Sequence, residues 1–147
     1  MIMLEAGTQA PDFSVNDHNG NLVSLKDFKG KKLTLWFYPK ADTPGCTIEG
    51  KGFRDDYEKF KGKNTAVLGV SVDNEADNKA FAEKFSFPYP LLCDEKRSLS
   101  LAYHAVESAN DEYAKRITYV IDETGKITSA IAEVNTKTHA SDICSHL

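Results

Sequence analysis

Cysteine is scarce in this chain of 147 residues, which contains only Cys46, Cys93 and Cys144. An odd number of widely spaced cysteines is unlike the dense, even pattern of a small domain held together by disulfides. The chain has no Cys-x-x-Cys pair, which argues against a thioredoxin-type disulfide reductase. It also has no cluster of cysteine and histidine at zinc-binding spacing, so we expect no metal site.

Long apolar runs are also absent. Residues 33–38 form a run of strand length, whereas a membrane-spanning helix needs about 20 apolar residues. The first residues have no basic segment, so we expect no secretory signal and a cytoplasmic location. The 18 basic and 22 acidic side chains give a net charge of −4. A mildly acidic chain has no overall attraction for phosphate backbones or anionic lipid, so neither nucleic acid nor a membrane is an expected partner.

Strands and helices are expected to alternate through the first two thirds of the chain. Residues 33–38 and 65–72 are β-branched and aromatic runs typical of buried strands, and residues 91–93 form a third, short strand. Residues 47–60 have the spacing of an amphipathic helix, although Gly50 and Gly52 weaken its first turns without an obvious local benefit. A second helix follows Asp73, which we expect to be its N-cap.

The remaining segments complete a mixed α/β domain. Hairpins are expected from residues 12–15 with 22–25 and from residues 116–121 with 126–134, and further helices over residues 95–104 and 138–147. Strand–helix–strand alternation implies parallel pairing, while the late hairpin adds antiparallel strands. We therefore expect one domain over residues 1–147, an α/β fold with a mixed central sheet and helices on both faces.

Cys46 lies at the junction between the first long strand and the helix that follows it. The intervening loop contains two prolines and a glycine. The carboxyl ends of parallel strands are where open α/β sheets build their sites, and a helix N-terminus favours a thiolate over a thiol. Position alone therefore predicts a reactive cysteine. The alternative is a small residue packed under the loop.

The motif around this cysteine resembles a known family. Pro39-x-x-x-Thr43-x-x-Cys46 fits the peroxiredoxin pattern, and the longer string Phe-Tyr-Pro-Lys-Ala-Asp-Thr-Pro-Gly-Cys-Thr resembles the bacterioferritin-comigratory, or peroxiredoxin Q, subfamily. Similar pieces occur in family order at residues 7–13, 69–73, 87–92 and 116–125. The resemblance implies a thioredoxin-like fold and a thiol-dependent peroxidase that reduces hydrogen peroxide and organic hydroperoxides without a metal or organic cofactor.

The resemblance also implies roles for five residues. Cys46 resembles the peroxidatic nucleophile, Thr43 the hydroxyl that bonds thiolate and peroxide, and Pro39 the residue that shields the pocket from water. Arg116 resembles the guanidinium that holds thiolate and peroxide, and Glu49 a carboxylate that orients it. The alternatives are an ordinary turn hydroxyl for Thr43, a surface strand cation paired with a carboxylate for Arg116, and a favourable first-turn acid for Glu49.

The chain departs from the family where a resolving cysteine is expected. The two usual positions are Lys51 and approximately Ala82, and neither has a thiol. Cys93, a candidate buried apolar cysteine, and Cys144, a candidate inert tail thiol, are the remaining resolving candidates. We therefore favour a one-cysteine mechanism in which thioredoxin, glutaredoxin or a small thiol restores Cys46.

The remaining expectations concern the alternative function, the oligomeric state, the aromatic run and the histidines. A redox-sensing or interaction protein with Cys46 as its sensor thiol is the alternative function, and the oligomeric state is a monomer or a weak dimer. Trp36, Phe37 and Tyr38 are expected in the core. The four histidines show no ligand spacing and no evident pairing with Cys46; they are His18, His104, His139 and His146.

Overall fold

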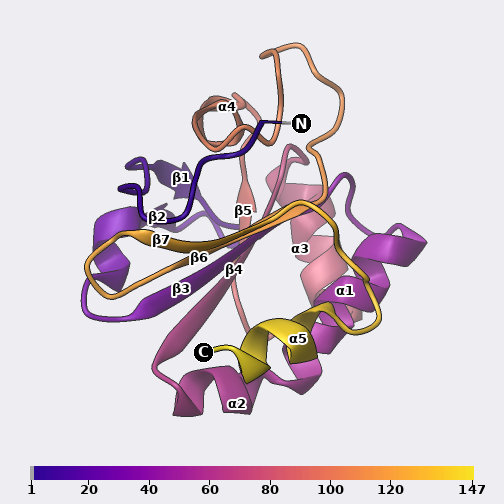
Figure 1. Cartoon of the computed structure of the whole chain (residues 1–147). Helices are drawn as coiled ribbons and strands as arrows, with labels where there is room; N and C mark the ends of the chain where they lie inside the picture. Colours follow the sequence, from indigo (N-terminus) through magenta and orange to yellow (C-terminus); the bar gives the residue numbers. More distant parts are fainter. Residues whose placement is uncertain (1) are drawn as a thin grey trace.

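The fold is built on one mixed, five-stranded sheet (Figure 1). The computed structural model describes residues 2–147. The strands of this sheet are β3 (Lys32–Phe37), β4 (Thr65–Ser71), β5 (Leu91–Cys93), β6 (Ile117–Ile121) and β7 (Ile127–Ile131). Their order is β5-β4-β3-β6-β7, with β3, β4 and β5 parallel and β6 and β7 antiparallel to their neighbours. The expected mixed sheet is confirmed.

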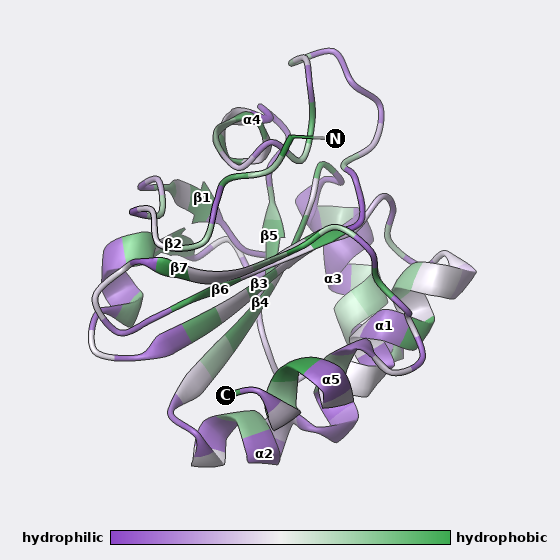
Figure 2. Ribbon diagram, viewed as in Figure 1, coloured by the Kyte–Doolittle hydropathy of each residue, from purple (hydrophilic) through white to green (hydrophobic). Residues whose placement is uncertain are grey.

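The sheet separates two apolar cores. One core packs beneath the hairpin of β1 (Ser14–Asn16) and β2 (Leu22–Ser24), the 3₁₀ helix η1 (Leu25–Phe28) and helix α4 (Ser98–Ala102). The other lies under helices on the opposite face, namely α1 (Pro44–Asp55), α2 (Tyr57–Gly62), α3 (Glu75–Lys84) and α5 (His139–Ser145). Helices on both faces are thus confirmed. In Figure 2 the hydrophobic colour follows most of the central strands, whereas α2 and α5 carry both colours.

Successive side chains of a strand point to opposite faces of the sheet, so β3 contributes side chains to both cores. Leu33, Leu35 and Phe37 belong to the core under the hairpin, while Trp36 belongs to the core under the helices. All of them are almost completely buried, as is Tyr38 just beyond the strand. The expectation that the aromatic run packs in the core is therefore confirmed.

Several boundaries differ from the sequence-based expectations. The helix expected over residues 47–60 begins earlier, at Pro44, and is interrupted at Asp56, where α2 takes over. The helix expected over residues 95–104 shortens to α4. The N-cap of α3 is Asn74, whose side chain accepts a hydrogen bond from the N–H of Asp77, so the assignment of this cap to Asp73 was wrong.

The helices are short. Within residues 2–147, none combines the length and the apolar character needed to cross a bilayer. The same residues contain no group of three or more histidine, cysteine, aspartate or glutamate side chains arranged to hold a metal ion.

Candidate active site

Cys46 is held in the first turn of α1, immediately after the loop that leaves β3. Thr43 is the N-cap with extended backbone, and Pro44 and Gly45 precede Cys46 in the helix. Proline suits this first position because its missing N–H would have no partner within the helix. The Cys46 side chain is completely buried. The positive end of the helix therefore lies next to a thiol that is shielded from water.

The loop before Cys46 is anchored to the neighbouring strand. The N–H of Ala41 donates to Oδ2 of Asp73 at 2.8 Å, and the hydroxyl of Ser71 donates to the same oxygen at 2.8 Å. This is the role that Asp73 has instead of the expected helix cap. Its position at the carboxyl end of β4, beside the end of β3, was the sequence signal for such a contact.

Arg116 connects Cys46 to Glu49. Its Nη2 lies 3.6 Å from the sulfur of Cys46, and its Nη1 donates to Oε1 of Glu49 at 2.8 Å. The Arg116 side chain is 25% exposed and precedes β6, which places it at the end of the sheet next to α1. Desolvation lowers the pKa of Arg116, but Glu49 and Cys46 outweigh it and raise the value. A surface cation does not fit this geometry, because the partner carboxylate is fully buried.

Glu49 lies in the second turn of α1 and is completely buried. The alternative of a first-turn acid is wrong, because the helix begins at Pro44 rather than at residue 47. Burial raises the pKa of Glu49 to about 7, although the hydrogen bond and the charge of Arg116 lower it. The carboxylate is therefore poised to change charge near neutral pH.

His139, which the sequence did not connect with the site, lies on the other side of Glu49. Its Nε2 is 3.7 Å from Oε2 of Glu49 and 2.8 Å from the hydroxyl oxygen of Thr118. Burial lowers the pKa of His139 to about 4, so the ring is neutral at pH 7 and the contact is not an ion pair. No local spacing could reveal this contact, because His139 and Glu49 are 90 residues apart in the chain.

The other two residues of the motif take less direct positions. Thr43 donates its hydroxyl to the carbonyl of Lys40 at 2.7 Å, which stabilises the loop. Pro39 is partly buried at the start of the same loop. The structure thus brings Cys46, Arg116 and Glu49 into direct contact, while the peroxide-binding role of Thr43 and the shielding role of Pro39 stay predictions.

The other two cysteines are free and buried. Burial raises the pKa of Cys93 to about 11, and the Asn78 amide donates to its sulfur at 3.4 Å. Cys144 lies in α5 and is 6% exposed, so it is a buried helix residue rather than part of a loose tail, and its inertness stays a prediction. Its carbonyl accepts a hydrogen bond from Lys63, just after α2, whereas the His139 end of α5 faces Glu49. Within residues 2–147, neither thiol forms a disulfide or a hydrogen bond with Cys46, although Cys144 belongs to the same apolar core as Cys46.

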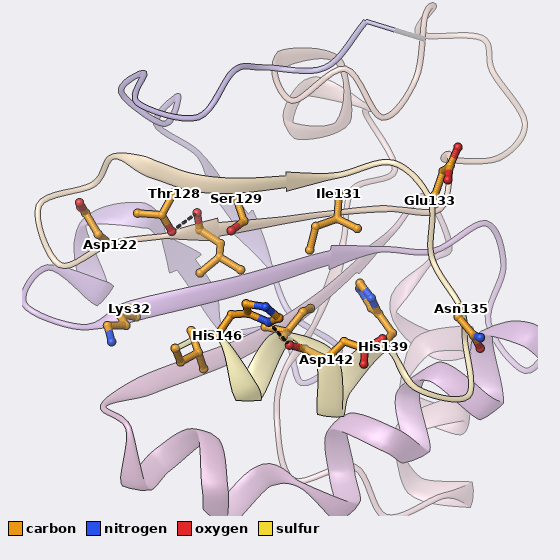
Figure 3. Close-up of a pocket in the computed structure, with 13 residues that line it drawn as sticks. Lys32, Asp122, Thr128, Ser129, Ile131, Glu133, Asn135, His139, Asp142 and His146 are labelled. Carbon is orange, nitrogen blue, oxygen red and sulfur yellow. Dashed lines mark hydrogen bonds between the residues drawn. The ribbon is translucent and has the colours of Figure 1, made fainter.

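A cavity of about 520 Å³ lies beside the site, between α5 and strands β6 and β7 (Figure 3). His139 lines it, as do Asp142 and His146 of α5 and Ile131 of β7. Cys46 and Arg116 are not among its lining residues. The histidine ring therefore lies between this cavity and the buried carboxylate of Glu49.

Comparison with known proteins identifies the family. The model of the AhpC/TSA family matches residues 6–130. A putative peroxiredoxin bcp from Coxiella burnetii is 36% identical over 149 residues, covering 98% of this chain and 99% of the relative. A chloroplastic peroxiredoxin Q from Gentiana triflora is 40% identical over 121 residues, covering 82% of this chain and 56% of the relative. The chain thus spans just over half the length of the chloroplast relatives it matches.

Solved structures agree with this assignment. Peroxidoxin BcpB from Mycobacterium tuberculosis superposes with a TM-score of 0.89 at 29% identity, covering 97% of this chain and 95% of that one. The bacterioferritin comigratory protein of Xanthomonas campestris gives a TM-score of 0.88 at 26% identity, with 97% and 96% covered. The implied thioredoxin-like fold is confirmed. The chain belongs to the AhpC/TSA family, among the peroxiredoxins of the Bcp and peroxiredoxin Q type.

Proposed function

We propose that this protein is a thiol-dependent peroxidase that reduces hydrogen peroxide and organic hydroperoxides. The observation that carries the proposal is the contact between Arg116 and Cys46, in which a guanidinium fixed by a buried carboxylate lies 3.6 Å from a sulfur in the first turn of a helix. The relative from Xanthomonas campestris is described by its alkyl peroxide reduction activity, which supports the same reaction here. Relatives named peroxiredoxin favour this enzyme over a redox-sensing protein.

The reaction begins with the thiolate of Cys46. Its sulfur attacks the terminal oxygen of the hydroperoxide, the S–O bond forms, and the O–O bond breaks. Sulfur loses two electrons and becomes a sulfenic acid, while the leaving alkoxide or hydroxide takes up a proton to become an alcohol or water. No metal or organic cofactor takes part in this step.

Most of the acceleration has to come from stabilising the charge that develops on the breaking O–O bond. The guanidinium of Arg116 contacts the sulfur, and the N–H of Cys46 would serve as a second donor to the peroxide. Each such donor contributes on the order of 10²-fold. Glu49 fixes the guanidinium through Oε1. Thr43 would bind the peroxide by turning its hydroxyl away from Lys40, and Pro39 would limit the entry of water.

We further propose a one-cysteine cycle. A first external thiol condenses with the sulfenic acid, releases water and leaves a mixed disulfide, and a second thiol then regenerates Cys46. The burial of Cys93, the raised pKa of its thiol and the position of Cys144 near Lys63 support this scheme. Thioredoxin, glutaredoxin or a small thiol would serve as reductant. A reducing compartment such as the cytoplasm suits three free cysteines.

The decisive experiment compares the wild type with Cys46→Ser. The wild type should consume hydrogen peroxide in the presence of a thiol and gain one oxygen atom in intact-mass analysis after one equivalent of peroxide. Cys46→Ser should do neither, with an unchanged circular dichroism spectrum. Hydroperoxide consumption by the folded variant at the wild-type rate would contradict the proposal. A loss of two hydrogens by the wild type would instead indicate an internal disulfide and overturn the one-cysteine cycle alone.

A further inference from the structure

The buried carboxylate of Glu49 uses only one of its two oxygens. Oε1 accepts from Arg116 at 2.8 Å, but Oε2 is completely buried and accepts no hydrogen bond from any residue in the described range 2–147. Leaving a buried acceptor without a donor is unfavourable, and more so when the acceptor is charged. Nε2 of His139 lies 3.7 Å from Oε2, where a proton on this nitrogen would stabilise the charged oxygen.

The imidazole of His139 is fixed in its orientation. Its Nε2 is 2.8 Å from the hydroxyl oxygen of Thr118 in β6. The ring also packs edge-on against Phe53 of α1, with 5.7 Å between the two ring centroids. Figure 3 shows the ring projecting from α5 toward the strands, at the boundary of the cavity. The side chain is only 4% exposed. The same nitrogen therefore stays directed at the space between Thr118 and Glu49.

The position of the proton on this ring matters for Glu49. At pH 7 the ring is neutral and carries one proton, on Nε2 or on Nδ1. With the proton on Nε2, the N–H donates to Thr118 and its positive end lies near Oε2 of Glu49. With the proton on Nδ1, the Thr118 hydroxyl donates to Nε2, and a lone pair faces the carboxylate. A charged Glu49 therefore selects the tautomer protonated on Nε2.

We propose that His139 is a positioning residue for the peroxide reaction, which keeps Glu49 charged and through Glu49 holds the Arg116 guanidinium on the sulfur of Cys46. The proposal rests on the peroxidase function, since Arg116 matters there as a donor to thiolate and peroxide. It adds a residue from the last helix to a site otherwise built from α1 and the start of β6. His139 does not itself touch the reacting atoms.

Four other titratable groups surround the pair. Arg116, beside β6, favours the charged form of Glu49 and opposes protonation of His139. Asp142, one turn further along α5, favours protonation of His139. Cys46 of α1 competes with Glu49 for Arg116, and the Tyr89 hydroxyl stays neutral because burial raises its pKa well above the ordinary value. Because burial raises the pKa of Glu49 to about 7, its charge changes near neutral pH.

The test compares His139→Phe, which fills the space but has no donor, with His139→Gln, which retains an N–H. In His139→Phe the titration of the Glu49 carboxyl, followed by carbon-13 NMR, should move up by about one pH unit, the scale of one lost charge-assisted contact. Sulfenic-acid formation should then be about tenfold slower near pH 6 and recover toward pH 9. His139→Gln should stay close to the wild type in both measurements.

Two controls separate this role from a structural one. Alkylation by iodoacetamide reports the Cys46 thiolate but breaks no O–O bond for Arg116 to polarise, so near pH 6 the rate with peroxide should fall more than the rate of alkylation in His139→Phe. His18→Phe changes another partly buried histidine, which accepts a hydrogen bond from the N–H of Leu91, and should leave the Glu49 titration in place.

The outcomes are distinguishable. An unmoved Glu49 titration in His139→Phe would overturn the inference, as would an equal loss of rate at every pH in both His139 variants. If the wild type reduces no hydroperoxide, the proposed function fails and the rate role of His139 fails with it. Because the NMR titration needs no peroxide, it decides the link from His139 to Glu49 separately from that result.

Discussion

The substitution Gly45→Ala should displace the guanidinium of Arg116 without lowering the stability of the fold. Gly45 precedes Cys46 in the first turn of α1, and a β-carbon added there would lie 2.9 Å from Nη2 of Arg116 and 3.4 Å from its central carbon. An unstrained contact between such atoms is about 3.5 Å, so the end of the Arg116 side chain must retreat by about half an ångström or more. The nitrogen that has to move is the one that contacts Cys46.

The expected loss of rate follows from this displacement. A misplacement of about 1 Å in an active site can cost about 10²-fold, so a shift of half that size should slow the reaction of Cys46 with hydrogen peroxide by about tenfold. Stability should not fall, because alanine is the better helix former by up to about 1 kcal/mol and the clashing atoms belong to the end of a flexible side chain. Stopped-flow kinetics and thermal unfolding measure the two effects separately.

Gly52→Ala is the matched control in the same helix. A β-carbon at Gly52 would lie 3.4 Å from the β-carbon of Ala140, an ordinary contact, so this variant should react at the wild-type rate. In an Arg116→Ala background, Gly45→Ala should have no further effect, since its target is gone. Two results would refute this placement of the guanidinium. One is a wild-type rate for Gly45→Ala, and the other is a loss of rate from Gly45→Ala that is as large in the Arg116→Ala background as in the wild type.

Three further predictions concern the same site and its support. Arg116→Ala should slow the reaction with peroxide by about 10²-fold, and Arg116→Lys should also be impaired because an ammonium lacks the planar fork of donors; near-normal stopped-flow rates for both would exclude the assigned role. Replacing Cys93 and Cys144 together by serine should preserve a rapid sulfenic-acid burst and turnover with an external thiol, whereas a stoichiometric disulfide between Cys46 and either thiol, trapped during wild-type turnover, would contradict this. Gly50→Ala should destabilise the protein by about 1–3 kcal/mol in denaturant unfolding, because its β-carbon would lie 2.5 Å from the ring of Phe87; unchanged stability would show that this packing is loose.

Much of the sheet was predictable because its strands are continuous apolar runs. Residues 33–38, 65–72 and 91–93 each correspond to a strand of the structure, and no strand end differs by more than one residue. The helices were less predictable, since the turn-forming residues Thr43 and Pro44 already belong to the start of α1, as its N-cap and first residue. Local patterns describe the interior of an element well and its ends poorly, because capping depends on only one or two side chains.

The reactive position of Cys46 could be inferred from local order alone, but its partners could not. Arg116 is 70 residues away in the chain, and only the family resemblance connected it to the cysteine. His139 was missed for the same physical reason, and Asp73 was assigned to a helix cap although its position at the end of a strand indicated the loop contact. The contact of His139 depends on how α5 packs on α1, which leaves no periodic signal in the sequence.

Gly50 shows how an apparent local weakness supports the site. In the sequence it only lowers the helix propensity, by about 1 kcal/mol relative to alanine. In the structure it lets α1 lie directly against Phe87 and Trp36, and its carbonyl accepts a hydrogen bond from the Tyr89 hydroxyl at 2.8 Å. Glu49 is the preceding residue, so the close approach that requires a glycine also helps to bury the carboxylate that holds Arg116. Because Glu49 is adjacent and its burial raises its pKa to about 7, a bulkier residue at position 50 should disturb the active site together with the core.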